Sequence, residues 1–141
     1  MRQDLRGGDL EGETMKSGDK PSVAIAHVTA KTRDVGETTR FYCDLGLRKV
    51  MQSERMSILE LRGGTHILFF KRSSEFKRPP SASFDLMVDD IVEFHARLKK
   101  MKVEVDPIRE DSLSGHRMFQ VKDPDGRAIT IFSSHTEGRP V

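Results

Sequence analysis

The sequence predicts an α+β fold in which two βαβββ modules pair their sheets edge to edge around one cavity. Residues 23–71 show the pattern of a strand, a helix and three further strands, and residues 83–134 repeat that order. Each copy of about 50–60 residues is too small to bury both faces of its own sheet. We therefore expect the two copies to share one core within a single domain at residues 22–136.

The repeat is visible in two pairs of landmarks. Asp90 lies 56 residues after Asp34, and each aspartate is followed three positions later by a glutamate, as in a capping box. Gly126 lies 62 residues after Gly64, and both glycines are placed in predicted turns. The difference between the two offsets implies that the second copy carries about six extra residues in its loops.

The first module is predicted at residues 22–72. Residues 23–32 are rich in β-branched and small side chains, which favours a strand. A helix follows between the N-cap Asp34 and the stop at Gly46. Alternating apolar segments then predict three short strands at about 48–52, 56–61 and 65–71. The charged segment KRSSEFKR at 71–78 is expected to be a solvated loop or a cover over the cavity.

The second module is predicted at residues 82–136. The expected helix begins after Asp90 and carries an apolar stripe. In the last strand, side-chain alternation places Ile129 and Ile131 in the core and Thr130 on the opposite face. The four strands of this module are expected at 83–89, 103–108, 116–123 and 127–134.

Composition limits the remaining possibilities. Residues 1–21 are charged and glycine-rich, so we expect a flexible N-terminal tail, with a short C-terminal tail at 137–141. The 24 basic and 22 acidic residues are interspersed and no Trp is present, which argues against nucleic-acid binding. No apolar run approaches the roughly 20 residues of a membrane span. Cys43 is the only cysteine, which excludes an intramolecular disulfide and favours a reducing cytoplasm.

Several motifs resemble the vicinal oxygen chelate superfamily, which includes glyoxalase I, fosfomycin-modifying enzymes, extradiol dioxygenases and bleomycin-resistance proteins. The similarity is carried by HVTAKTRDVGETTRFYCDLGL at 27–47, VDD at 88–90 and VKDPDGRAITIF at 121–132. It covers about residues 23–135. The resemblance implies a U-shaped mixed sheet built from two βαβββ modules, with a ligand cavity inside the U.

The resemblance also implies four equivalent strand positions that hold His or Glu ligands in metal-using members. In this sequence those positions hold His27, Leu68, Ser83 and Thr130. One imidazole, two hydroxyls and an isobutyl group are too few donors for a divalent metal, which needs three or four. We therefore expect no metal cofactor.

A rebuilt metal site remains an alternative. His66 lies two residues before Leu68 and Asp85 lies two after Ser83, so each shares the face of its neighbour. Together with His27 they would form a set of two histidines and one carboxylate for one divalent ion. The direction of Glu60 is left open.

The leading functional hypothesis is a metal-independent module that binds a small, partly aromatic organic ligand, similar to bleomycin-resistance proteins. That branch makes dimers with shared cavities, which implies a homodimer. Its members tend to be acidic, whereas this chain has a net charge of +2, so an anionic or neutral ligand fits better. The expected cavity residues are His27, Thr29, His66, Leu68, Phe70, Ser83, Asp85, Thr130 and Phe132.

Two enzymatic hypotheses remain as alternatives to the binding module. The first is a metal-dependent glyoxalase- or dioxygenase-like enzyme that uses the rebuilt ligand set. Glyoxalase I and fosfomycin modification themselves are disfavoured, because hydroxyl side chains replace ligands at Ser83 and Thr130. The second is metal-free acid–base catalysis by His27 with Asp85.

Overall fold

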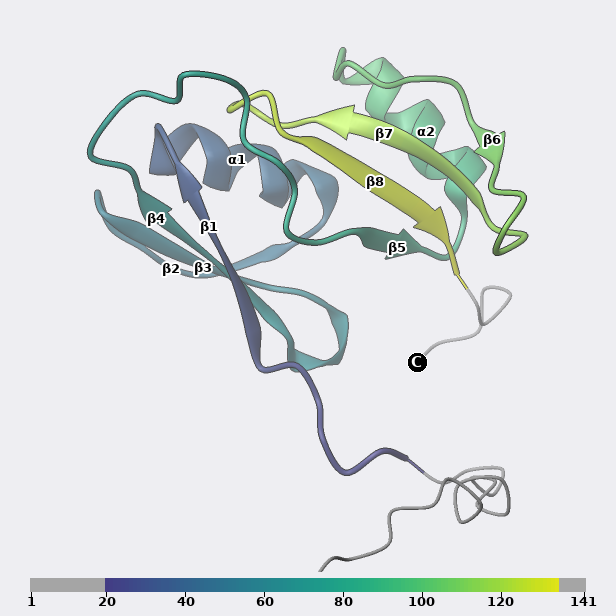
Figure 1. Cartoon of the computed structure of the whole chain (residues 1–141), viewed down its shortest axis with the longest axis horizontal. Helices are drawn as coiled ribbons and strands as arrows, with labels where there is room; N and C mark the ends of the chain where they lie inside the picture. The colour runs from purple at the N-terminus through teal and green to yellow at the C-terminus, as the bar shows by residue number, and fades with distance from the viewer. Residues whose placement is uncertain (1–19, 135–141) are drawn as a thin grey trace, which may run out of the picture.

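The computed structural model describes residues 20–134 and confirms the predicted fold of two βαβββ modules (Figure 1). Most of the expected N-terminal tail and all of the expected C-terminal tail at 137–141 lie outside the described residues. The first module consists of β1 (His27–Thr32), α1 (Val35–Leu45), β2 (Arg48–Gln52), β3 (Met56–Glu60) and β4 (His66–Lys71). The second consists of β5 (Leu86–Val88), α2 (Ile91–Lys100), β6 (Arg109–Glu110), β7 (Arg117–Lys122) and β8 (Ala128–Ser133).

Each module forms its own four-stranded mixed sheet. The strand orders are β1-β4-β3-β2 and β5-β8-β7-β6, so the two sheets have the same topology. In both modules the first strand pairs in parallel with the last, and the other neighbours are antiparallel. A parallel pair needs a long crossover, which the helix and two strands between its members supply.

The two helices begin as the sequence predicts. The side chain of Asp34 accepts a hydrogen bond from the Glu37 backbone N–H at 3.0 Å, and Asp90 does the same for Glu93 at 3.0 Å. Each carboxylate satisfies one backbone donor that the first helical turn leaves unpaired. At the end of α1, Gly46 has a φ of 127°, a conformation that glycine adopts without steric cost.

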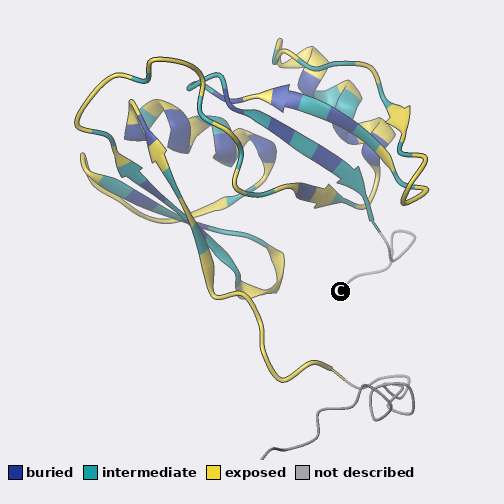
Figure 2. Cartoon of the chain, in the orientation of Figure 1, coloured by how far each residue is buried: buried dark blue, intermediate teal, exposed yellow. Residues whose placement is uncertain are grey.

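One hydrophobic core extends through both modules. Tyr42, Leu59 and Phe69 from the first module belong to the same buried cluster as Phe119 and Ile131 from the second. Figure 2 shows the buried positions on the inner sides of α1 and α2 and alternating along the strands. The prediction that the Ile face of β8 is core is confirmed, since Ile129 and Ile131 are completely buried.

Three strand predictions were wrong in their limits. The strand expected at 83–89 is formed only at Leu86–Val88, as β5. The first strand begins at His27 rather than at residue 23. Its partner β4 begins at His66, which lies opposite His27, so residues 23–26 have no strand beside them. The segment 103–108 is not a strand, although Val105 forms a single bridge with Val121. The edge strand β6 lies further on, at Arg109–Glu110, and has only two residues.

A buried cluster of polar residues joins the modules, and we call Tyr42, Asp123, Asp125 and Arg127 the junction cluster. Tyr42 Oη donates to Asp123 Oδ2 at 2.8 Å, and Arg127 Nη1 donates to the same oxygen at 2.6 Å. Arg127 Nη2 also donates to the carbonyl of Lys31 in β1 at 2.6 Å. These contacts connect α1 and β1 to the turn before β8, so they fix how the two sheets sit against each other.

Candidate functional site

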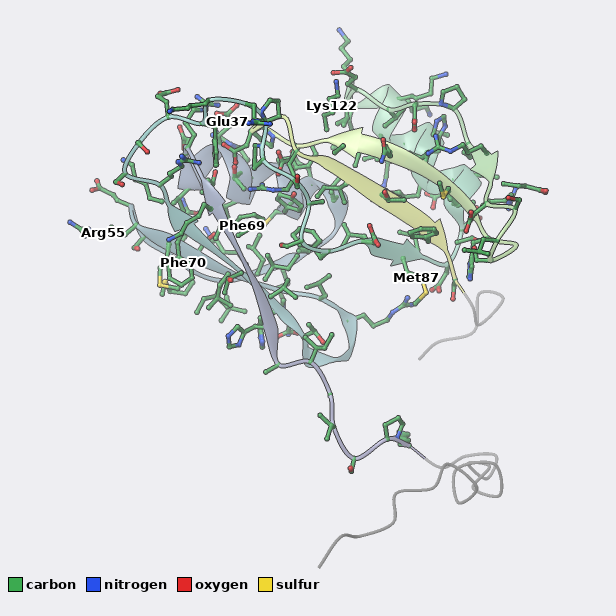
Figure 3. All side chains as sticks on the ribbon, viewed as in Figure 1. Glu37, Arg55, Phe69, Phe70, Met87 and Lys122 are labelled. Carbon is green, nitrogen blue, oxygen red and sulfur yellow. The ribbon has the colours of Figure 1, made fainter. Side chains whose placement is uncertain are left out.

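Each sheet has one face packed on its helix and one face turned away from it, which we call the open face. In β3 and β4 the buried side chains are Ser57, Leu59, Ile67 and Phe69. The alternate positions, among them Leu68 and Phe70, are only half-buried. Figure 3 shows Phe69 within the body of the molecule and Phe70 on the other side of the sheet. The open face therefore exposes apolar side chains that a ligand can cover.

The first sheet places five of the predicted site residues on its open face. His27 lies opposite His66 in the parallel β1–β4 pair, and Thr29 lies opposite Leu68. Phe70 follows two positions after Leu68 and therefore shares its face. Glu60, whose direction the sequence left open, lies beside His66, with 3.7 Å between Oε2 and Nε2. This carboxylate also pairs with Arg48.

The second sheet contributes Thr130 and Phe132 from β8. The Thr130 hydroxyl accepts a hydrogen bond from Gln120 Nε2 at 3.3 Å. The Phe132 ring meets the imidazole of His116 edge-on, with 6.1 Å between ring centroids. Both are partly exposed, unlike the buried isoleucines that alternate with them in β8.

The remaining two predicted residues lie in the segment before β5 rather than in a strand. Ser83 Oγ donates to the Thr29 carbonyl at 3.3 Å, which brings this segment against β1. Asp85 is exposed and belongs to no ion pair among residues 20–134. The side chains expected to line the cavity thus come from both sheets and from the connection between them.

The donor set at these positions does not fit a metal ion. At the four positions where the resemblance implies ligands, only His27 is a strong donor for a transition metal, and Leu68 has no donor atom. Within residues 20–134, no three His, Cys, Asp or Glu side chains gather in a group that could hold a metal. The set His27, His66 and Asp85 is therefore not assembled as a site in this arrangement.

We call residues 72–85, which connect β4 to β5, the linker. A pocket of about 470 Å³ opens between β1, the end of β4 and this linker, and we call it the pocket beneath the linker. Three predicted residues line it, namely Thr29, Phe70 and Ser83. Its other walls are Ala30, Lys31, Arg72, Phe76, Pro80, Ser81 and Arg127. It combines two aromatic rings with hydroxyl and cationic groups, the mixture typical of sites for small organic molecules.

A second pocket of about 330 Å³ lies where the end of α1 meets β5 and α2. Its rim carries an ion pair between Arg62 Nη1 and Asp89 Oδ2 at 2.7 Å. None of the nine predicted residues lines it, and its lining comes largely from core side chains such as Leu45, Leu86 and Phe94. We therefore regard the pocket beneath the linker as the candidate ligand site.

Sequence reasoning missed the residues that give this pocket its charge. Lys31 is two positions after Thr29 in β1, so strand alternation alone was enough to place it on the same face. Arg72 and Phe76 belong to the charged segment 71–78, which was expected to be a loop or a cover over the cavity. Arg127 carried no sequence signal, because its burial depends on contacts with distant parts of the chain.

Burial and charge also affect the ionisation of the junction cluster behind this pocket. Burial raises the pKa of Tyr42, and the charge of Asp123 and its hydrogen bond to the phenol raise it further. Tyr42 therefore acts as a neutral donor to the carboxylate over the whole physiological range. The cluster is a fixed structural element, with Arg127 and Asp123 almost completely buried.

Comparison with known proteins agrees with this architecture. The sequence profile described as Glyoxalase/Bleomycin resistance protein/Dioxygenase superfamily matches residues 24–131. No protein with a curated description matches the chain significantly in sequence. Neither helix of residues 20–134 has the length and apolar character needed to cross a membrane.

Three solved structures illustrate the likeness of fold. The bleomycin resistance determinant encoded on the transposon Tn5 is 23% identical with a TM-score of 0.66, over 80% of this chain and 99% of that one. Lactoylglutathione lyase from Agrobacterium tumefaciens is 17% identical with a TM-score of 0.66, over 84% and 98%. A bleomycin-binding protein complexed with bleomycin is 23% identical with a TM-score of 0.62, over 82% and 100%.

Proposed function

Because the chain belongs to the glyoxalase/bleomycin resistance protein/dioxygenase superfamily, we propose that it binds a small organic molecule on its open face without a metal ion. The observation that carries this proposal is the pocket beneath the linker, which is lined by Thr29, Phe70 and Ser83. Its volume of about 470 Å³ falls within the range of sites for drug-sized ligands. The bleomycin-binding protein of the same fold is complexed with a small ligand.

The chemistry of the open face supports binding rather than metal-assisted catalysis. Leu68 and Thr130 occupy two of the positions at which metal-using relatives carry ligands, and neither side chain coordinates a divalent cation well. Half-buried apolar side chains gain contact area when a ligand covers them, at about 25 cal/mol per Å² of apolar surface. A partly aromatic molecule is the class that such a face favours.

The test is a thermal-shift screen of a small-molecule panel on the full chain, run with a chelator and again with added Zn²⁺, Ni²⁺, Mn²⁺ or Fe²⁺. We expect ligands that raise the melting temperature equally in the presence of the chelator. Phe70→Ala should weaken binding of these ligands about tenfold, because the ring forms one wall of the pocket. Val92→Ala is the matched control, since Val92 is exposed on α2, away from the pocket.

Two results would contradict the proposal. Stoichiometric metal binding with a large rise in melting temperature would favour the metal-dependent enzyme. If the ligands bind the Phe70→Ala variant as tightly as they bind the natural chain, the site lies elsewhere.

We also propose that the chain forms a homodimer. Val23 and Ile25 are 82% and 67% exposed, on a segment that extends away from the domain (Figure 1). Val50 and Met51 on the edge strand β2 and Met87 on β5 are further exposed apolar residues. A second copy would remove these side chains from water.

Sedimentation velocity of the full chain tests the dimer. We expect a dimer that Ile25→Asp with Met51→Asp dissociates, because each substitution would bury a charge at the interface. Val92→Asp, on the exposed side of α2, should leave the dimer intact. A monomer at all concentrations, or a dimer that survives both changes, would contradict this assignment.

A further inference from the structure

The pocket beneath the linker differs in charge from the protein as a whole. Three cationic residues, Lys31, Arg72 and Arg127, line it, and no aspartate or glutamate is among its lining residues. The whole chain, by contrast, has 24 basic and 22 acidic residues and a net charge of only +2. The positive charge of this pocket is therefore a local feature rather than a reflection of composition.

Lys31 and Arg72 each rest on an aromatic ring of the same pocket. Lys31 Nζ lies 5.4 Å from the centroid of Phe70, and the guanidinium carbon of Arg72 lies 4.3 Å from the centroid of Phe76. Stacking on a ring holds a cation in position while its N–H groups remain available to an anion. The same rings offer apolar surface to the body of a ligand.

Within the described part of the chain, no carboxylate pairs with Lys31 or Arg72. Among the ion pairs of residues 20–134, none includes Lys31 or Arg72. The Arg72 side chain makes one long hydrogen bond, from Nε to Ser74 Oγ at 3.4 Å. Arg127 differs, because Asp123 compensates its charge at 2.6 Å, although its Nε has no hydrogen-bond partner.

An adjoining pocket of about 580 Å³ extends the positive region. It shares Lys31, Phe70 and Arg72 with the first pocket and adds Arg55 and Lys71. Glu54 is the one acidic residue in its lining. We call Lys31, Arg55, Lys71 and Arg72 the basic corner. Like charges that line one pocket repel one another, so an anion bound among them lowers their electrostatic energy.

We propose that the pocket beneath the linker binds an oxyanion carried on an aromatic ring, with Lys31 and Arg72 on the anion and Phe70 and Phe76 against the ring. This inference rests on the proposed function and specifies its ligand class. A carboxylate and a phosphate ester share the required chemistry. Both accept hydrogen bonds from a guanidinium edge and an ammonium group.

The test measures binding of three probes to the full chain by titration calorimetry at low ionic strength, about 50 mM salt. The probes are 2-naphthoate, 1-naphthyl phosphate and the neutral analogue 2-naphthamide. We expect at least one anionic probe to bind about tenfold or more tightly than the amide. Whichever anion binds identifies the source of the charge as a carboxylate or a phosphate.

The double variant Lys31→Gln with Arg72→Gln should weaken binding of that anion about tenfold and change binding of the amide less than about twofold. The control is Lys99→Gln with Arg117→Gln, which removes the same charge from exposed positions outside both pockets. It should leave the affinity for the anion within about twofold. Thermal unfolding of both double variants establishes that they fold.

Three results would overturn the inference: neither anion binds, the amide binds as tightly as the anions, or the control pair weakens the anion as much as the test pair. None of these results would contradict the proposed function, which requires only that the pocket binds a small organic molecule. Neutral ligands from the thermal-shift panel that depend on Phe70 would still support a small-molecule site.

Discussion

Arg127 and Asp123 form a buried ion pair whose partners depend on each other. Their side chains are 2% and 0% exposed, and the carboxylate also accepts from Tyr42. Taking both charges out of water is costly, so the pair by itself adds little net stability. Its value lies in geometry, because Arg127 also donates to the Lys31 carbonyl and thereby ties the second module to β1.

We expect Arg127→Met to destabilise the protein by about 3–5 kcal/mol, because it leaves the Asp123 carboxylate buried without its cation. Urea unfolding followed by far-ultraviolet circular dichroism measures this change. Arg117→Met, at an exposed position in β7, is the control and should change the free energy of unfolding by less than about 0.5 kcal/mol. A similar small effect of both substitutions would show that Asp123 finds other compensation.

The raised pKa of Tyr42 predicts that the free energy of unfolding depends on pH in the alkaline range. Its pKa is raised in the folded protein, so the folded state retains the phenol proton above pH 10 while the unfolded state loses it. The stabilisation is therefore complete below about pH 10 and declines above it, by up to about 1.4 kcal/mol per pH unit. Tyr42→Phe should lack this decline. The measurement is the difference in unfolding free energy between the two proteins from pH 8 to 11. A constant difference would contradict the prediction.

At the scale of elements, the two N-caps show how local sequence fixes a helix start. Asp34 and Asp90 each accept a backbone hydrogen bond at 3.0 Å. We expect Asp34→Ala and Asp90→Ala each to lower the free energy of unfolding by about 1 kcal/mol. Asp44→Ala, at an exposed position within α1, serves as the control and should have little effect. Equal losses for all three would indicate a general effect of charge instead of capping.

Strand limits depend on neighbours more than on composition. Residues 23–26 have β-favouring side chains but no strand partner, whereas Arg109 and Glu110 form β6 because Arg117 and Met118 lie beside them. A strand exists only where another strand accepts its hydrogen bonds. Such partners are set by the tertiary fold, so the ends of β1 and β6 were the least accurate parts of the sequence prediction.

At the scale of the whole molecule, the shared core makes the two modules interdependent. Phe69 and Phe119 belong to one buried cluster although they lie in different sheets. We therefore expect a single cooperative unfolding transition, with the same midpoint by Tyr42 fluorescence and by far-ultraviolet circular dichroism. Phe69→Leu and Phe119→Leu should lower that midpoint by both signals together. Two separate transitions would mean that the modules fold independently.

The site was predictable from the sequence only in part. Alternation placed Thr29, Leu68, Phe70 and Thr130 on the face away from the core, and the structure agrees. Periodicity of two along a strand is a local property, so sequence reports it well. The direction of Glu60 and the environment of Asp85 were not predictable in this way, since they depend on where one segment packs on another.

The sequence by itself determined the family, the duplicated module, the helix caps and the core face of each central strand, because these follow from short-range spacing and side-chain type. Only the tertiary structure decided that Arg72 and Phe76 from the linker meet Lys31 and Phe70 from two strands. It also decided that Arg127 is buried beside Lys31, 96 residues earlier in the chain. These contacts depend on how the two modules pack around a common core, which no local sequence pattern encodes.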